Sequence, residues 1–224
     1  MTKSDFVLSN VTELPPHFVE AVKEVTRSGN LMLDFGSARN AHRNLIEALG
    51  ARYIGLDLRA GAMVRGDAHR LPFTEAAFDG AISMTVLEHL YNPFIATAEL
   101  FRVLKPGARF LGSVAFLEPF HDHSYCHLSR LGTIAVLESA GFQIVRMWPG
   151  VSILETFFDD LFVGWPSFTR ALWRAFGKAL ELVRVLGIRA CRFAARRAGR
   201  RGPDETELAY VVAGSIGFIC RKPA

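Results

Sequence analysis

The sequence has few cysteines and no apolar segment long enough to cross a membrane. Its three cysteines (Cys126, Cys191 and Cys220) are widely spaced and odd in number, which argues against a disulfide framework and indicates reduced thiols. The longest uncharged run, residues 208–220, has 13 residues, whereas a membrane-spanning helix needs about 20. Residues 1–10 are polar and of mixed charge, without the apolar core of a signal peptide. We therefore expect a cytoplasmic protein.

Acidic residues are nearly absent from one segment near the C-terminus. Residues 170–201 contain ten basic residues and one acid, Glu181, which gives the segment a net charge of +9. The whole chain carries +4, which leaves about −5 for the remainder. The basic segment contains no recognisable nucleic-acid reading module and the rest of the chain is acidic, so we expect no nucleic-acid partner.

Apolar runs alternate with helical patterns along the chain, and half of the 224 residues are hydrophobic. This alternation predicts one α/β domain, residues 1–224, with a mostly parallel sheet covered on both faces by helices. The expected strands are residues 31–35, 53–57, 62–68, 78–84, 108–117, 142–148 and 208–220. The expected helices are residues 12–28, 41–49, 94–104, 131–139 and 168–198.

The first two expected strands and the helix between them have the parts of a nucleotide-binding unit. An apolar strand containing Asp34 leads into Gly36, which allows a tight turn close to a ligand. Asp57 lies 23 residues after Asp34 and ends the second strand, where an acid can bind ribose hydroxyls. A glycine turn alone does not identify the nucleotide.

Several short motifs follow one another in a fixed order along the chain. They are Leu33-Asp34-Phe35-Gly36, Asp57, Gly66-Asp67-Ala68 with Leu71-Pro72-Phe73, Phe78-Asp79, Met84 to Leu90, and Leu104-Lys105-Pro106-Gly107. With these motifs the sequence resembles the class I S-adenosylmethionine-dependent methyltransferases, especially their small-molecule branch. The resemblance extends from about residue 31 to residue 148 and resumes at the final strand. It implies a Rossmann-like, doubly wound, seven-stranded sheet and S-adenosyl-L-methionine as the cofactor.

The resemblance implies a role for each of these motifs in binding the cofactor. The first motif would hold the methionine part, Asp57 the ribose, and Asp67 the exocyclic amine of adenine. The alternatives are helix capping by Asp34, a solvated turn at Asp57, capping of the next turn by Asp67, and packing with hydrogen bonding by Glu88. The expected cofactor-binding residues are Asp34, Phe35, Gly36, Ser37, Asp57, Leu58, Asp67, Ala68, Met84 and Glu88.

The turn departs from the family pattern at two positions where glycine is usual. Ala38 adds a methyl group where the cofactor approaches closely, and Asn40 tolerates left-handed backbone better than most residues. The departure at Ala38 is expected to affect cofactor affinity without removing binding.

Histidines gather behind the fifth expected strand, in residues 121–127. Their spacing fits no standard zinc module, and one short loop rarely supplies four ligands, so we expect no metal. Histidine titrates near neutral pH, and related methyltransferases have a histidine in a similar Pro-Phe-His context after strand five, which here is residues 119–121. His121 and His123 are therefore candidate catalytic bases, and the alternative is that these histidines only order the loop.

Residues 151–207 form a helical insertion before the last strand that the common fold does not need. Residues 168–201 within it form a basic, amphipathic helix. Three roles are open: a lid over the acceptor, a homodimer interface, and peripheral contact with the inner membrane surface.

These features predict a methyltransferase acting on a small-molecule, glycan or lipid-linked acceptor, with O-methylation favoured. Two alternatives remain at this point. One is a non-catalytic membrane-surface binding protein that retains the fold, and the other is a nicotinamide-dependent oxidoreductase on a similar sheet.

Overall fold

The computed structural model describes residues 14–118, 123–154, 157, 161, 166–200, 202 and 204–224. The candidate base His121 lies outside the described residues. The strands are β1 (Leu31–Phe35), β2 (Arg52–Asp57), β3 (Val64–Arg65), β4 (Phe78–Met84), β5 (Leu104–Ala115), β6 (Gln143–Pro149) and β7 (Ser215–Arg221). The helices are α1 (Pro16–Val25), α2 (Arg43–Ala48), the 3-10 turn η1 (Leu87–His89), α3 (Pro93–Val103), α4 (Arg130–Ser139), α6 (Ser167–Arg197) and α7 (Glu205–Val211).

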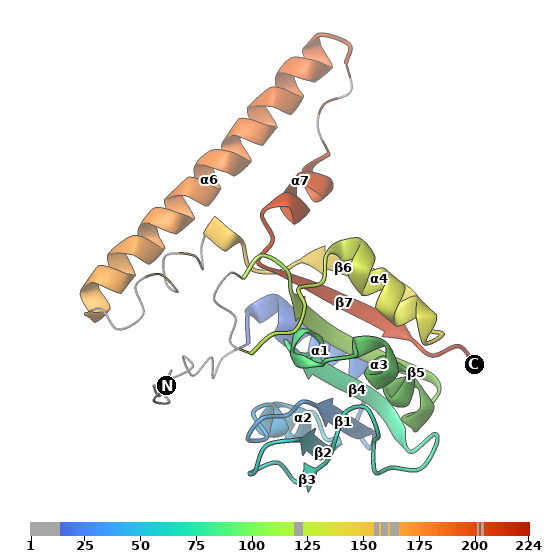
Figure 1. Ribbon diagram of the computed structural model, residues 1–224. Helices are drawn as coiled ribbons and strands as arrows, with labels where there is room; N and C mark the ends of the chain where they lie inside the picture. Colours follow the sequence, from blue (N-terminus) through green and yellow to red (C-terminus); the bar gives the residue numbers. More distant parts are fainter. Residues whose placement is uncertain are drawn as a thin grey trace.

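The seven strands form one sheet in the order β3-β2-β1-β4-β5-β7-β6. The strands from β3 to β5 are parallel, and β7 runs antiparallel between β5 and β6. This arrangement confirms the expected doubly wound, mostly parallel α/β fold (Figure 1). The carboxyl ends of β1, β2, β4 and β5 lie at one edge of the sheet, where open α/β sheets bind their ligands.

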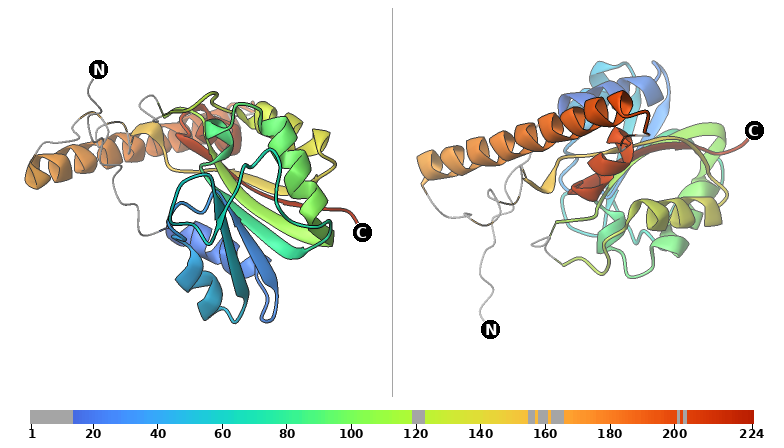
Figure 2. Two further views of the ribbon diagram at one scale, coloured as in Figure 1. Left: turned by 60° about the horizontal axis from the view of Figure 1, so that its bottom comes forward. Right: turned by 90° about the horizontal axis from the view of Figure 1, so that it is seen from above.

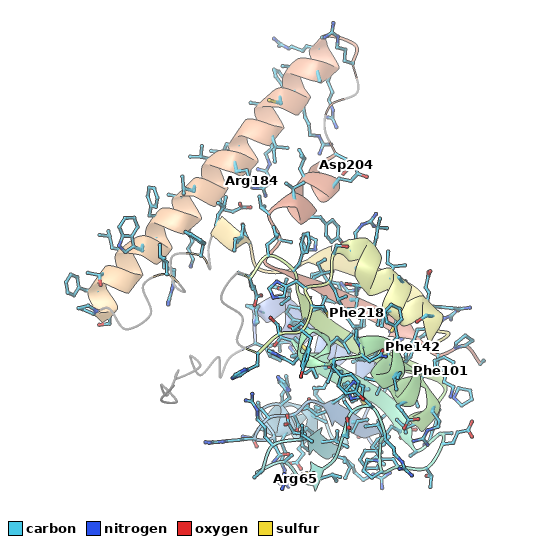
Figure 3. The ribbon with its side chains drawn as sticks, viewed as in Figure 1. Arg65, Phe101, Phe142, Arg184, Asp204 and Phe218 are labelled. Atoms are coloured by element: carbon cyan, nitrogen blue, oxygen red, sulfur yellow. The ribbon has the colours of Figure 1, made fainter. Side chains whose placement is uncertain are left out.

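Successive residues of each strand pack against different helical layers, because strand side chains alternate between the two faces. Met32 and Ile82 pack with α1 and α2, whereas Leu33 belongs to the core under α3 and α4. Figure 3 labels three phenylalanines of this second layer. Among them, the rings of Phe101 and Phe142 meet edge to face with centroids 5.0 Å apart.

The expected strand over residues 208–220 is wrong in its first half. Helix α7 occupies Glu205–Val211, and strand β7 begins only at Ser215. The pairing of β7 with β5 ends at Ser215, opposite Ala115, and an isolated antiparallel bridge then joins Ala213 to Ser152, so residues 205–211 lie beyond the ladder of the sheet. They satisfy their backbone within a helix instead, as shown by the bond from Leu208 N to Asp204 O at 3.0 Å.

Helix α6 confirms the long helix expected over residues 168–198, and it projects away from the sheet (Figures 1 and 2). Its 31 residues span about 46 Å at 1.5 Å per residue. Among the described residues, no helix is both long enough and apolar enough to cross a membrane.

Candidate active site

The turn after β1 has left-handed backbone at three positions. Gly36 has φ +78°, and a Cβ there would overlap the side chain of Val86, so this position requires glycine. Ala38 and Asn40 have φ values of 49° and 60°, which explains why glycine is usual at both positions in the family pattern. Asn40 also ties the turn to the next loop, because its Nδ2 donates to Gly61 O at 3.0 Å.

Asp34 is fully buried beneath this turn. Its Oδ2 accepts a hydrogen bond from the Tyr53 hydroxyl at 2.7 Å and lies 3.0 Å from Nδ1 of His42. Burial, together with the negative charge of Asp34, raises the pKa of Tyr53, so the phenol stays protonated and remains a donor. Oδ1 of Asp34 has no hydrogen-bond partner among the described residues, and a buried carboxylate oxygen of this kind can accept from a ligand.

Asp57 stands at the carboxyl end of β2 and faces the same turn. Its Oδ2 accepts from the backbone N–H of Ala38 and its Oδ1 from that of Arg59, both at 2.8 Å. A carboxylate offers about four acceptor positions, so two remain for ribose hydroxyls. Leu58 and Met63 nearby are 66% and 46% exposed, so their apolar side chains are open to contact with a ligand beside Asp57.

Asp67 lies in the loop after β3, and its side chain is bound to His69. Its Oδ1 accepts from His69 N at 2.9 Å and lies 2.7 Å from His69 Nδ1, and these bonds lower the pKa of Asp67. The backbone N–H of Asn92 donates to Nε2 of His69 at 3.3 Å, which places the ring proton on Nδ1. The His69 ring also stacks on Tyr91 with centroids 3.9 Å apart, so the ring that holds Asp67 is itself fixed in position.

The carboxyl end of β4 is strained and closely packed. Thr85 has φ +52°, a genuine outlier for a β-branched residue, and its N–H donates to Ser113 O at 3.0 Å. Met84 before it is half-buried. Glu88 is fully buried, and its Oε1 accepts from the backbone N–H of Ala115 at the end of β5.

The loop after β5 is tied to the same region. The backbone N–H of Tyr125 donates to Glu88 O at 2.7 Å. His127 has its Nδ1 3.1 Å from Phe116 O and its Nε2 3.1 Å from Ser124 Oγ, so it orders the loop. His123 is exposed, with φ +51°, two residues before the anchored Tyr125.

Burial raises the pKa of the Cys126 thiol in this loop, with a further contribution from the Glu88 carboxylate. The thiol therefore stays protonated near neutral pH and is a poor nucleophile. Among the described residues, no group of three or more histidine, cysteine or acidic side chains could hold a metal ion.

The structure therefore gathers most of the expected cofactor-binding residues at one edge of the sheet. The side chain of Phe35 instead lies in the core, and Ser37 is buried beneath the turn. The sequence did not predict the roles of three residues. Tyr53 and His42 hold Asp34 in place, and His69 holds Asp67. In the sequence these residues are visible only as polar groups near apolar strands. Their contacts with the acids could not be read from it, because they form between residues that are not neighbours in the sequence.

A cavity of about 380 Å³ lies beside this edge, between the start of α1, the end of β6 and the helices α6 and α7. On its α6 side, Arg184 donates to Glu181 at 2.6 Å and also lies 3.3 Å from Leu208 O of α7 (Figure 3). Arg184 lowers the pKa of Glu181, which keeps this carboxylate charged. Ser152 and His17 complete the polar part of the lining, and the other lining residues are Pro15, Pro149, Gly150, Val151, Ala209, Val212 and Ala213.

We compared the sequence with known protein families. Residues 33–112, from β1 into β5, match the family described as methyltransferase domain. This part of the chain is therefore similar to a methyltransferase domain. The family implies S-adenosylmethionine as the methyl donor, in agreement with the sequence resemblance.

A protein of Mycolicibacterium smegmatis, named a probable S-adenosylmethionine-dependent methyltransferase, is 32% identical to this methyltransferase domain over 123 residues. The aligned region covers 50% of this chain and 42% of that protein, so the chain spans less than half the length of this curated relative.

Solved structures agree on the fold. The SpnF cyclase superposes with a TM-score of 0.61 at 19% identity, over 93% of this chain and 80% of its own. The phosphoethanolamine N-methyltransferase 2 of Haemonchus contortus, solved with S-adenosyl-L-methionine, gives 0.58 at 15% identity, over 93% of this chain and 53% of its own. Because one of these proteins is a cyclase, the fold alone does not determine the reaction.

Proposed function

We propose that this chain binds S-adenosyl-L-methionine and transfers its methyl group to an amphipathic small-molecule, glycan or lipid-linked acceptor. The observation that carries the proposal is the convergence of Asp34, Asp57 and Asp67 on the carboxyl edge of the methyltransferase domain. Bound there, the cofactor supplies an electrophilic methyl group on a sulfonium. The protein's task is to align the acceptor with it and to exclude water.

Each acid has a distinct task in this proposal. Asp34 directs Oδ1 toward the methionine part of the cofactor, because its Oδ2 is occupied by Tyr53 and His42. Asp57 accepts from the ribose hydroxyls while holding the turn through Ala38. Asp67 accepts from the adenine amine, with its pKa kept low by His69.

The acceptor would occupy the cavity beside this edge, with the insertion of residues 151–207 as its lid. The inner side of α6 forms one wall of the cavity through Glu181 and Arg184. A cavity of about 380 Å³ suits a small-molecule headgroup, and its lining combines this ion pair with apolar residues. This mixed lining favours an amphipathic acceptor.

If the acceptor atom is a hydroxyl oxygen, an imidazole of the loop after β5 would take its proton as the oxygen accepts the methyl group that the cofactor supplies, and S-adenosylhomocysteine would be the leaving group. His123 is the described candidate, and His121 remains the second candidate. His123→Gln should lower kcat and remove the limb of the pH–rate profile that reports the base. His127→Gln is the matched control, because His127 is engaged by Phe116 and Ser124. An unchanged pH profile in His123→Gln would leave His121 as the remaining base.

The first test of the proposed function is calorimetric titration with S-adenosyl-L-methionine. Asp57→Ala should weaken binding by at least about tenfold, since it removes the ribose acceptor and frees the turn. Asp79→Ala is the matched control: Asp79 bonds Leu31 N and Lys105 at the opposite edge, so its loss should lower stability and leave affinity unchanged. A folded wild-type protein without measurable binding would contradict the proposal.

The two alternative functions give different results in the same experiment. Cofactor binding without formation of S-adenosylhomocysteine on any acceptor would favour the non-catalytic binding protein. Tight NADH binding would favour the oxidoreductase, but the antiparallel β7 between β5 and β6 departs from the all-parallel order of dinucleotide-binding sheets. The match to a methyltransferase domain also argues against the oxidoreductase.

A further inference from the structure

Helix α6 faces the protein with the side that carries Glu181 and Arg184, next to the half-buried apolar residues Trp173, Leu180 and Ile188. Gly177 is buried, and Glu181 and Arg184 are half-buried where they line the cavity. The bond from Arg184 to Leu208 O fixes this side of the helix toward α7, and the Glu181–Arg184 ion pair within α6 holds the arginine in place. An amphipathic helix on a globular protein normally buries its stripe of large apolar side chains, whereas α6 leaves such a stripe exposed.

The opposite side of α6, which we term the outer face, is apolar and exposed. At 100° per residue, its large side chains fall within about 120° of the helix circumference, and no charged residue between Phe168 and Ala194 falls in that arc. Phe168 is 73% exposed, and the least exposed member, Phe176, is 46% exposed. The outer face consists of Phe168, Leu172, Phe176, Leu182, Val183, Leu186 and Phe193.

Basic residues border the outer face. Lys178, Arg189 and Arg196 lie next to its edge on the helix, and Arg197 follows it in the last turn. Their long side chains can extend along a surface that the apolar residues enter. The only acid in residues 170–201 is Glu181, which lies on the inner side in its ion pair with Arg184.

This charge decides between the two occupants that could cover such a face. A second copy of α6 would bring another segment of net charge +9 against the first, and the two would repel each other. An anionic lipid surface attracts the same charge and accepts the apolar side chains at its acyl boundary. The helix would lie along that surface.

We propose that the outer face of α6 binds an anionic phospholipid membrane surface. Resting on the proposed function, this placement explains a lipid-linked acceptor: α6 would have lipid on one side and the acceptor cavity on the other. A membrane-embedded acceptor would then reach the cavity without crossing bulk water.

The test is flotation of the full-length protein with vesicles of phosphatidylcholine alone or with about 30 mol% phosphatidylglycerol. The wild type should bind the anionic vesicles at least about tenfold more tightly than the neutral ones, with affinity falling as salt rises. The double variant Leu172→Glu/Leu186→Glu should lose at least about tenfold of the anionic binding.

The matched control is Ile95→Glu/Leu131→Glu, which makes the same charge change at exposed apolar residues of α3 and α4. It should bind anionic vesicles within about twofold of the wild type, since it leaves the outer face intact. An equal loss in the control would overturn the proposal by assigning the effect to net charge alone. Absence of wild-type binding would also overturn it, as would a dimer in sedimentation velocity that Leu172→Glu/Leu186→Glu dissociates.

Cofactor titration of the same variants separates this proposal from the proposed function. The outer face lies away from the cofactor-binding acids, so Leu172→Glu/Leu186→Glu should bind S-adenosyl-L-methionine as the wild type does. Vesicle binding by a protein that binds no cofactor would support the membrane proposal and contradict the proposed function. Cofactor binding without vesicle binding would do the opposite.

Discussion

The hydrogen bond from Tyr53 to Asp34 should be a main support of the cofactor-binding turn. The hydroxyl and the carboxylate are 2.7 Å apart, Tyr53 is only 4% exposed, and Asp34 is fully buried. Tyr53→Phe keeps the ring and removes one donor from a buried charge. Because a hydrogen bond to a charged group contributes about 1.5–3 kcal/mol, we expect a loss of about 2 kcal/mol in the free energy of unfolding.

For a domain of this size, that loss corresponds to a decrease in Tm of about 4–8 °C. Thermal unfolding followed by circular dichroism measures it, and urea unfolding gives the free energy. Tyr125→Phe is the control, because Tyr125 is 70% exposed and its removal of a hydroxyl should leave Tm unchanged. In an Asp34→Asn background the Tyr53→Phe effect should shrink to about half, since the charge is gone. A Tm of Tyr53→Phe equal to that of the wild type would refute the reasoning.

Three further changes test other parts of the structure. Gly36→Ala should lower Tm and cofactor affinity more than Gly29→Ala, because both positions have φ near +80° but only a Cβ at Gly36 meets another side chain; equal effects would show that backbone strain alone matters. Ala38→Gly should raise the free energy of unfolding by up to about 1 kcal/mol, because it removes left-handed strain that the free protein already carries, as urea unfolding would show. A hydrogen bond from Arg102 lowers the pKa of Glu99 below its ordinary value of 4.5. The pair therefore stabilises the fold above pH 4.5, and this contribution is lost as the pH falls through the lowered pKa of Glu99 in the folded protein. Thermal melts should therefore separate Glu99→Gln from the wild type at pH 7, and the difference should shrink as the pH falls through the lowered pKa of Glu99.

Much of the fold followed from the sequence because strand and turn signals are local. The expected strand 78–84 is β4 to the residue, and the helix expected at 131–139 is α4 with one more residue. The glycine turn is where it was expected. The error at residues 208–211 arose because an apolar run does not reveal where its ladder partners end.

The site was predictable only in part, for a different reason. A family pattern places Asp57 and Asp67 at strand ends, but not the contacts through which Ala38 and His69 hold them. The amphipathic pattern of α6 was likewise visible in the sequence. Which of its sides faces the protein depends on α7 and the end of β6, and these are placed only by the folded chain.

The position of β7 between β5 and β6 has a consequence for the order in which the protein can fold. During synthesis, β6 emerges with no strand to pair with, since its neighbour in the sheet is β7. All of α6 is synthesised in the interval, with its apolar face uncovered, before Arg221 completes the last strand. A nascent chain held at this stage would expose both an unpaired strand and an apolar helix, the two features most prone to aggregation. A nearby lipid surface would protect the helix during that interval, so α6 could engage the membrane before the sheet that it accompanies is complete.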